Sequence, residues 1–441
     1  MTRLRGAAAT TFRSLHVRNF RLFFTGQTIS QVGNWLTLIA QTLLVLKLTD
    51  SGIALGLLAA FQFGPVLLFG AFAGLVADRS DKRKLLLIVQ SLAMVQSFTL
   101  ATLAFTHHPP VWSIYLVAMF GGMTTAFDNP ARRSFVVEMV EEDDVTNAVS
   151  LNSALMTGSR IVGPALGGLL VATAGFGWAF TVDGLSYIAV LVSLYLMDTR
   201  QLRQPPVTPR GKGQVRAGLA YAWSIAELRV PLIMMTVIGT LAFNFQTVLP
   251  LFAERDLHGT ELTFSFLMSV VSVGSLAGAL RSAARRQVSV RTVSLTALGF
   301  GAAMLALSAA RGTPMAFGFG VLMGFTSISF MTTSTAIVQL RADPSMRGRV
   351  LALQAMVFLG STPIGGPIVG AISQRFGARY ALLLGAVATL AAGLYGLAVV
   401  RAGGADERPE EIDEVVSVEA LSEAAEGLRD GPVVIAPRAA S

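Results

Sequence analysis

Long apolar stretches separated by short polar connections dominate the pattern of the chain. A membrane-spanning helix needs about 20 mostly apolar residues, and twelve such stretches can be placed in the sequence. Their approximate bounds are 21–46, 53–77, 84–106, 111–130, 147–173, 178–197, 231–252, 263–283, 292–310, 315–337, 350–373 and 381–400. The pattern therefore predicts an all-α integral membrane protein with twelve transmembrane helices.

Two longer polar segments divide the chain into expected domains. Residues 199–229 hold three prolines and two glycines between positions 205 and 213, a density that indicates a linker. Residues 401–441 hold ten acidic residues, and acidic tails of this kind are usually solvated and disordered. We expect an N-terminal six-helix bundle over 1–198, a C-terminal six-helix bundle over 230–400, and a disordered cytoplasmic tail.

The basic residues predict how the chain is oriented in the membrane. With the N-terminus inside the cell, twenty-four Lys and Arg side chains ahead of the tail fall in cytoplasmic segments, and five fall in external loops. Cytoplasmic loops carry such an excess, so both termini are expected in the cytoplasm. The formal net charge of +8 would suggest nucleic-acid binding in a soluble chain. Here topology and contact with anionic lipid explain it, and no nucleic-acid partner is expected.

Composition excludes several classes of function. Only 14% of the residues are charged, against about 25% in soluble domains. The chain has no cysteine and four histidines, which excludes disulfides and thiolate metal sites, and no metal or cofactor is expected. A Gly-x-x-x-x-Gly-Lys-Ser/Thr phosphate loop is also missing from the sequence. An enzyme or a membrane-embedded sensor is therefore the least favoured class.

Two short segments in the first half of the chain have similar counterparts in the second half. Residues 163–168 read Gly-Pro-Ala-Leu-Gly-Gly, and residues 366–371, which lie 203 positions later, read Gly-Pro-Ile-Val-Gly-Ala. Gly74 has a counterpart in Gly278, 204 positions later. Echoes at almost one offset indicate a duplicated six-helix unit, and parallel repeats of this kind place a substrate site between the halves, near the midplane.

The most specific motif lies between the second and third apolar stretches. Residues 74–84 read Gly-Leu-Val-Ala-Asp-Arg-Ser-Asp-Lys-Arg-Lys. This segment resembles the Gly-x-x-x-Asp-Arg/Lys-x-Gly-Arg/Lys-Arg/Lys loop of the major facilitator superfamily, except that Asp81 stands where the family prefers glycine. The resemblance covers about residues 19–400 and implies a cytoplasmic gating latch. Its residues would be Gly74, Asp78, Arg79 and Arg83.

The fifth stretch resembles a motif of the proton-coupled exporters in this superfamily. Their Gly-Pro-x-x-Gly-Gly motif is matched by Gly163, Pro164, Gly167 and Gly168. Proline kinks the helix and the glycines allow close packing; a tight helix crossing without a role in transport is the alternative. Segments 17–23, 129–135 and 147–153 are similar to the enterobactin-exporter-like branch. The resemblance implies a monomeric, multi-pass protein of the bacterial inner membrane.

Polar stripes and flexible apolar side chains mark an expected central cavity. Gln27, Gln31 and Asn34 share one face of the first predicted helix, and the first, fourth, seventh and tenth helices line the cavity in this superfamily. Further candidates for the cavity lining are Met119, Phe120, Met123, Phe127, Phe243, Asn244, Phe245 and Thr333. Hydrogen bonding between helices, contact with lipid and ordinary packing are the alternatives. Met and aromatic residues suit amphipathic organic molecules.

Three charged residues lie within the predicted spans. A mid-bilayer arginine costs on the order of 2.5–3.5 kcal/mol, so Arg160 is expected to face the interior and contact an acid or an anionic substrate. Asp183 is the candidate proton carrier because burial disfavours a charged carboxylate; a fixed structural role is equally compatible. Asp128 is expected to pair with Arg132 or Arg133. Arg160 and Asp183 are predicted to lie at different depths.

These features favour a secondary active exporter of amphipathic small molecules, such as drugs, siderophores or secreted metabolites, with protons as the second partner. The fourth stretch lacks the arginine, and the first lacks the carboxylate, that many exporters of the superfamily carry. Proton coupling is therefore implied by the motif of the fifth stretch. The alternative is a metabolite importer or symporter of the same fold.

Overall fold

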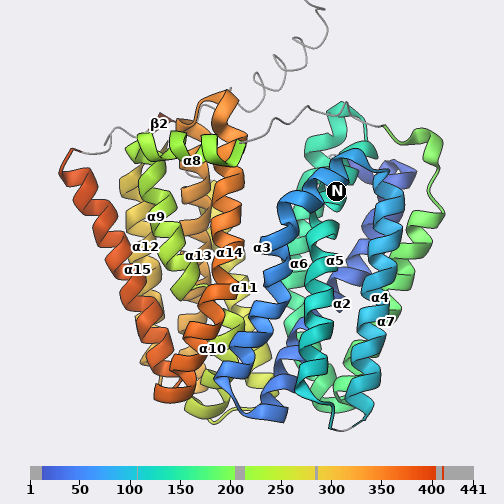
Figure 1. Cartoon of the computed structure of the whole chain (residues 1–441), viewed down its shortest axis with the longest axis horizontal. Coiled ribbons are helices and arrows are strands. Elements are labelled where there is room, and N and C mark those ends of the chain that lie inside the picture. The colour runs from blue at the N-terminus through green and yellow to red at the C-terminus, as the bar shows by residue number, and fades with distance from the viewer. Residues whose placement is uncertain (1–11, 107, 204–213, 284–286, 404–409, 412–441) are drawn as a thin grey trace, which may run out of the picture.

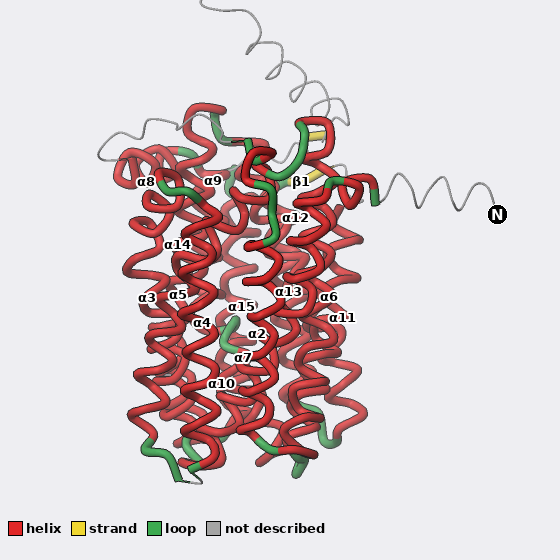
Figure 2. The backbone as a smooth tube through the Cα atoms, turned by 90° about the vertical axis from the view of Figure 1, so that its right-hand side faces the viewer, coloured by secondary structure: helices red, strands yellow, loops and turns green. Residues whose placement is uncertain are grey.

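Helices make up almost all of the structure. The computed structural model describes residues 12–106, 108–203, 214–283, 287–403 and 410–411. Within this part, the β structure is a single antiparallel pair, in which β1 (Gln287–Val288) lies against β2 (Glu410–Glu411) (Figure 2).

The first part of the chain forms one 3-10 turn and six long helices. They are η1 (Arg13–His16), α2 (Arg18–Thr49), α3 (Gly52–Arg79), α4 (Lys82–Phe105), α5 (Val111–Glu138), α6 (Glu142–Ala174) and α7 (Phe176–Tyr195). The rest of the described chain contains a second 3-10 turn, a π-helical turn, two short helices and six longer helices. They are η2 (Thr199–Gln201), α8 (Gln214–Ser224), α9 (Ala226–Leu241), α10 (Phe245–Leu251), the π-helical turn η3 (Phe252–Asp256), α11 (Glu261–Ala283), α12 (Val290–Ser308), α13 (Thr313–Arg341), α14 (Pro344–Phe376) and α15 (Ala378–Arg401).

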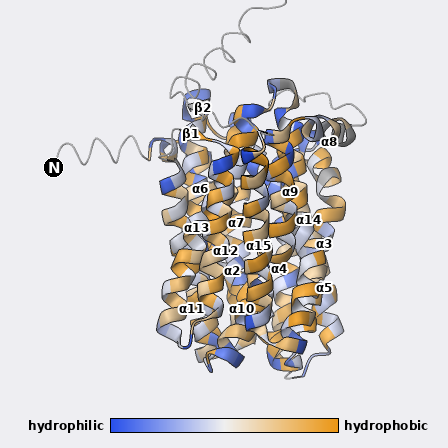
Figure 3. Ribbon diagram, turned by 90° about the vertical axis from the view of Figure 1, so that its left-hand side faces the viewer, coloured by the Kyte–Doolittle hydropathy of each residue, from blue (hydrophilic) through white to orange (hydrophobic). Residues whose placement is uncertain are grey.

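Eleven helical segments of the described chain are long and apolar enough to cross a membrane, with α9, α10 and η3 taken together as one. Hydrophobic residues cover the length of these helices and polar residues gather at their ends (Figure 3). Helix α5 contains the predicted stretch 111–130 and packs on α3 and α4, but it is not one of the eleven. Gly121, Gly122, Thr124 and Thr125 interrupt its apolar residues.

The long helices form two groups, α2–α7 and α9–α15, that lie side by side (Figure 1). The same contacts occur in both groups. Helix α2 packs on α6 and α7 as α9 packs on α14 and α15, and α3 packs on α5 as α11 packs on α13. Helix α4 packs on α5 and α7 as α12 packs on α13 and α15.

The two ends of the molecule differ in character. The basic end carries the loops that follow α3, α5 and α13, together with α8, and these are tied to each other by side chains: Lys82 contacts Glu138, and the Tyr221 hydroxyl donates to Asp343 at 2.9 Å. The far end carries the connections after α2, α6 and α10, and that between α14 and α15. These two names are kept below.

The two groups meet closely near the far end, where α3 packs on α14 and α6 on α11. A Cβ atom at Gly56 would come within 2.5 Å of the carbonyl oxygen of Gly366, so only glycine permits this approach. Nearby, Arg255 donates to the Asp50 carboxylate at 2.8 Å, and the Gly52 amide donates to Gln374 at 2.7 Å. The backbones of α3 and α14 are therefore in direct contact at this end.

Three regions differ from the sequence-based expectations. The expected linker 199–229 contains η2 and the helix α8, while residues 204–213 lie outside the described part. The predicted helix 231–252 is interrupted at Ala242–Asn244, between α9 and α10. In the tail that was expected to be disordered, Glu410–Glu411 pairs with β1, because extended backbone there finds hydrogen-bonding partners; residues 404–409 and 412–441 are not described.

Adding one methyl group at Gly56 should separate α3 from α14. Crowding a tight contact costs about 1–3 kcal/mol, so Gly56→Ala should lower the thermal midpoint of the detergent-purified protein. The matched control is Gly64→Ala, because a Cβ at Gly64 meets no atom within 4 Å and alanine favours a helix. An equal midpoint for both variants, measured by intrinsic fluorescence, would contradict the close contact.

Candidate functional site

The motif of residues 74–84 forms the end of α3 and the start of α4. Lys82 is buried, and its ammonium lies 2.6 Å from the carboxylate of Glu138 at the end of α5. The Arg83 guanidinium donates to the carbonyl oxygen of Leu194 at 2.7 Å, at the end of α7. Asp81 accepts from the Lys84 amide at 3.0 Å and so caps α4. The motif therefore ties three helices of the first group together at the basic end.

The predicted role of Gly74 in close helix packing is not realised in this structure. A Cβ at Gly74 or at Gly70 would meet no atom of the described residues within 4 Å. The contacts of α3 with α14 run from Gly52 to Leu67 and stop short of this face of α3, although the neighbouring Ala73 and Ala77 are buried. Asp78 is half-buried and Arg79 is exposed. The counterpart Gly278 is in a different environment, against Phe325 of α13.

The motif of α6 lies where this helix contacts both groups. Gly163 packs on Trp35 of α2, and Gly167 packs on Leu36 of the same helix. Gly168 faces the opposite group, against Ser265 of α11. Pro164 is buried between these contacts. The small residues of this motif thus let α6 pack tightly against a helix of its own group and one of the other.

Arg160 lies one turn before this motif on α6. Its guanidinium lies over the ring of Trp35, with 6.0 Å between the central carbon and the ring centroid. Much of its surface is exposed, although it is in the middle of an apolar helix. Among the described residues, no carboxylate forms an ion pair with it. The expected contact with an acid of the protein is therefore not found.

Asp183 is fully buried between α7, α2 and α4. One carboxylate oxygen accepts from the hydroxyls of Thr37 and Ser97, both at 2.6 Å. The other oxygen finds no partner within the described residues. Gly33 makes room for it, since a Cβ there would come within 2.5 Å of this oxygen. Asp183 is therefore a carboxylate with two hydroxyl donors and, within the described part of the chain, no cation beside it.

The predicted difference in depth between Arg160 and Asp183 does not match the structure. Arg160 contacts Trp35, and Asp183 contacts Gly33 and Thr37, so both face the same turn of α2. Helix α2 passes between Arg160 and Asp183, so the two charged side chains do not meet. The depth of each residue was predicted from its distance to the end of its own helix. The sequence does not give the relative heights of the ends of α6 and α7, so the two depths could not be compared.

A polar network fills the half of the first group that is nearer the basic end. Arg132 forms an ion pair with Asp128 at 2.8 Å, and Gln90 donates to Asp128 at 2.6 Å. Arg132 also contacts Gln27 at 3.4 Å, and Gln31 donates to Gln27 at 3.1 Å. Of the predicted cavity residues, Gln27 therefore links α2 to α5, and Gln31 supports it from the same helix.

The remaining cavity candidates are placed in different surroundings. Asn34 is exposed and accepts from the Tyr187 hydroxyl at 2.8 Å. Thr333 is buried against Thr296 of α12, and Asn244 is buried at the break before α10. Phe243 and Phe245 pack with Phe300 and Phe358 in an aromatic cluster, and Phe127 packs on Phe72. Met119 and Phe120 are exposed, and Met123 is half-buried.

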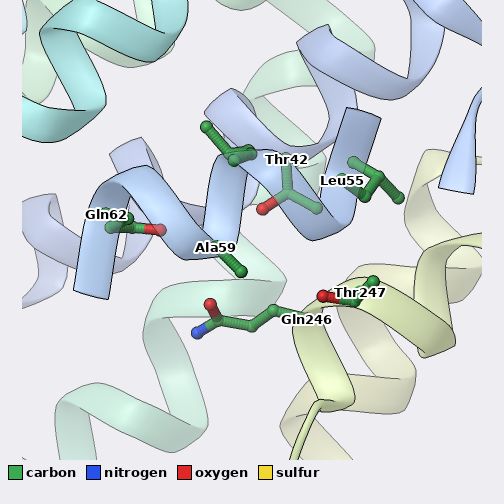
Figure 4. A pocket seen from close by; sticks show the side chains of 7 residues that line it. Thr42, Leu55, Ala59, Gln62, Gln246 and Thr247 are labelled. Atoms are coloured by element: carbon green, nitrogen blue, oxygen red, sulfur yellow. The ribbon is translucent and has the colours of Figure 1, made fainter. Parts of the chain in front are cut away.

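A small pocket lies between the two groups near the far end (Figure 4). It is lined from α2 and α3 by Thr42, Leu55, Leu58, Ala59 and Gln62, and from α10 by Gln246 and Thr247. Figure 4 shows the amide groups of Gln62 and Gln246 and the hydroxyl groups of Thr42 and Thr247 around this pocket. Polar side chains from both groups of helices thus meet at the contact between the groups.

Comparison with known families identifies this architecture. A family model described as transmembrane secretion effector matches residues 9–436, which is nearly the whole chain. The chain belongs to this family of major facilitator superfamily transporters. The resemblance predicted from residues 74–84 and 163–168 is confirmed.

Curated relatives of this transporter move small molecules in bacteria. It is 25% identical to the staphyloferrin A transporter of Staphylococcus aureus, over 81% of the chain and 90% of that protein. It is 22% identical to macrolide efflux protein A of Streptococcus pyogenes, over 83% and 92%. It is 23% identical to the enterobactin exporter EntS of Escherichia coli, over 86% and 89%. The chain is a multi-pass membrane transporter, not an enzyme.

Solved structures agree on the fold. The transporter aligns with a bacterial homologue of the human lysosomal transporter Spinster, crystallised in an inward-facing, occupied conformation, with a TM-score of 0.69. The two are 14% identical, and the alignment covers 87% of this chain and 96% of the other. At this identity the likeness shows a common fold.

Removing the buried ammonium of Lys82 should destabilise the first group. Lys82→Met leaves Glu138 buried without its cation, and breaking a buried pair in this way costs about 3–5 kcal/mol. The double variant Lys82→Met/Glu138→Leu should recover most of this loss, because it removes both charges. Thermal unfolding in detergent measures both effects.

The matched control for this prediction is Lys84→Met, because Lys84 is exposed and lies 3.8 Å from Asp81. Exposed pairs contribute about 0–1 kcal/mol, so the midpoint should hardly change. A loss as large as that of Lys82→Met would show that the basic character of the loop matters, rather than the pair with Glu138.

Proposed function

We propose that this transporter is a proton-coupled exporter that moves amphipathic small molecules out of the cell by alternating access. The observation that carries the proposal is the contact pattern of α6, whose exporter-type motif packs on α2 of one group and on α11 of the other. Relatives named for siderophore export and macrolide efflux support the direction of transport. Such relatives favour an organic substrate over a sugar or an inorganic ion.

The topology that we propose has twelve spans and both termini in the cytoplasm. Helix α5 would be the twelfth span, because it packs on α3 and α4 along with the spanning helices. Residues 1–198 and 230–400 would form the two six-helix bundles, and the repeated helix contacts of the two groups support a duplicated unit. The basic end would face the cytoplasm, as the distribution of Lys and Arg predicts.

This orientation assigns a conformation to the structure. The far end, which would face outward, is closed by Gly56 against Gly366 and by the pair Asp50–Arg255. A Cβ at Gly70 or Gly74 would meet no atom of the described residues within 4 Å, which would fit two groups that are apart toward the cytoplasm. The structure would represent the inward-facing state. In the outward-facing state Gly74 would gain a helix neighbour, and Asp78, Arg79 and Arg83 would latch the cytoplasmic side.

Asp183 is the proposed proton carrier. It is a fully buried carboxylate with hydroxyl partners and, among the described residues, no cation beside it, and hydroxyl groups can bond to either protonation state. Its contacts to α2 and α4 would connect a change of protonation to helices that line and support the central space. Asp128 is not proposed for this role, because it is paired with Arg132.

Transport in inside-out membrane vesicles tests the proposal directly. With an acidic lumen, vesicles that contain the transporter should accumulate radiolabelled macrolide or enterobactin, and collapse of the pH gradient should abolish the accumulation. Accumulation that does not respond to the gradient would exclude proton antiport. Accumulation by intact cells in place of inverted vesicles would favour the importer instead.

Asp183→Asn should abolish uptake driven by the pH gradient while leaving exchange of substrate across the membrane without a gradient. The amide keeps the size of the side chain but cannot take up and release a proton at neutral pH. Glu141→Gln is the matched control, because Glu141 is an exposed carboxylate that pairs with Arg203. Normal gradient-driven uptake in Asp183→Asn would make Asp183 a structural residue.

Asp78→Asn should lower the transport rate while the protein still inserts into the membrane in normal amounts. The loss of charge weakens the latch of the outward-facing state, which every cycle must pass through. Asp81→Asn is the control, because asparagine caps a helix about as well as aspartate. Normal turnover of the Asp78 variant in the vesicle assay would refute the gating role.

A further inference from the structure

The side chain of Arg160 projects into the space between the two groups. In the part of α6 beyond Arg160, the large exposed apolar residues are Val162, Leu166 and Leu169, and they mark the side that faces lipid. At 100° per residue, Arg160 lies about 160° away from Val162 on this helix. It also lies between Gly163, which faces α2, and Gly168, which faces α11. Its exposed surface is therefore on the inner side of α6.

On the helices packed against α6, each carboxylate either bonds to another side chain or lies far from Arg160. Asp183 on α7 is held by Thr37 and Ser97 on the other side of α2. On α5, Asp128 pairs with Arg132, and Glu138 pairs with Lys82. The described part of α2 carries no acidic residue, and the one on α11, Glu261, is in its first turn at the far end.

Trp35 gives the guanidinium a fixed position without neutralising it. The ring lies 6.0 Å from the central guanidinium carbon, within the range of a cation–π contact. Trp35 is itself held by the close approach of Gly163. A guanidinium supported on one face by an aromatic ring keeps its planar row of N–H donors free for a carboxylate or another oxyanion.

The stretch of α11 that faces α6, within residues 262–280, offers hydroxyl groups and no charged side chain. The contact between Gly168 and Ser265 fixes the register of α6 against α11. At a rise of 1.5 Å per residue, Ser272 lies close to the level of Arg160, and Ser269 lies one turn nearer the far end. Both lie within about 40° of Ser265 around α11. The Ser269 hydroxyl is buried and has no partner among the described residues.

We propose that Arg160 and Trp35 form an anion-binding subsite, and that the substrates are amphipathic organic anions with an apolar or aromatic body and a carboxylate or similar group. The oxyanion would lie against Arg160, and the apolar body would lie between the two groups. This inference rests on the proposed export function and names its substrate class. It also explains why a mid-span arginine has no carboxylate partner among the described residues.

Binding of a matched pair of probes tests the subsite. 1-Pyrenebutyrate and 1-pyrenebutanol share one aromatic body and differ in the anionic group, and pyrene accepts excitation energy from nearby tryptophan. Titrated into the purified full-length protein in neutral detergent, the wild type should bind the carboxylate at least tenfold more tightly than the alcohol, since charge-assisted hydrogen bonds are the strong ones. Trp35→Phe should lower the energy transfer, although three other tryptophans remain.

Arg160→Gln should abolish the preference for the carboxylate and leave the affinity for the alcohol unchanged, which also shows that the variant is folded. Arg160→Lys keeps the charge without the planar donors and should retain part of the preference for the carboxylate. If the glutamine variant fails to fold, the reduced preference of the lysine variant tests the subsite in its place. Arg311→Gln, at an exposed arginine outside the helices, is the control and should bind like the wild type.

Two results would overturn the inference: equal affinity of the wild type for both probes, or an unchanged preference in Arg160→Gln. Neither result bears on export, which the vesicle assay measures separately. A protein that transports macrolide but shows no preference for the anion would refute the subsite alone. A protein that prefers the anion at Arg160 but transports nothing along a pH gradient would refute the proposed function alone.

Discussion

The arrangement of the two groups depends on one contact near the far end, where the backbone of α3 at Gly56 lies directly against the backbone of α14 at Gly366. Lipid is as apolar as the helices, so burial of apolar surface does not drive helices together in a membrane, and close packing must do so. Gly56 against Gly366, and Gly168 against Ser265, provide that packing. Because both contacts lie near one end of the molecule, the groups can separate at the other end without losing them.

The placement of charges follows from the same surroundings. In a medium of low polarity, a charge must be paired or must remain next to water. Lys82 with Glu138 and Arg132 with Asp128 satisfy this within the first group, so relative motion of the two groups does not break these pairs. The pair Asp50–Arg255, by contrast, links one group to the other and is partly exposed. It would have to separate if the far end opened.

Much of the fold could be predicted from the sequence, because membrane helices are encoded locally by length and hydrophobicity. The motifs of residues 74–84 and 163–168 also identified the superfamily. Pairings between helices were not predictable in the same way. Lys82 resembled any other residue of a basic loop, and its burial depends on where Glu138, 56 positions later, ends α5. The relative heights of Arg160 and Asp183 depend on how far α6 and α7 slide along α2, which no local pattern reports.

If Asp183 carries a proton as proposed, the hydroxyl groups around it affect the energetics of proton uptake. A hydroxyl can donate or accept, and it changes from one to the other by rotation of a single O–H bond. Thr37 and Ser97 can therefore bond to the carboxylate and to the carboxylic acid with the heavy atoms in the same places. Protonation of Asp183 would then require only hydrogen atoms to move within this site, and a helix movement that followed would respond to the change in electric field.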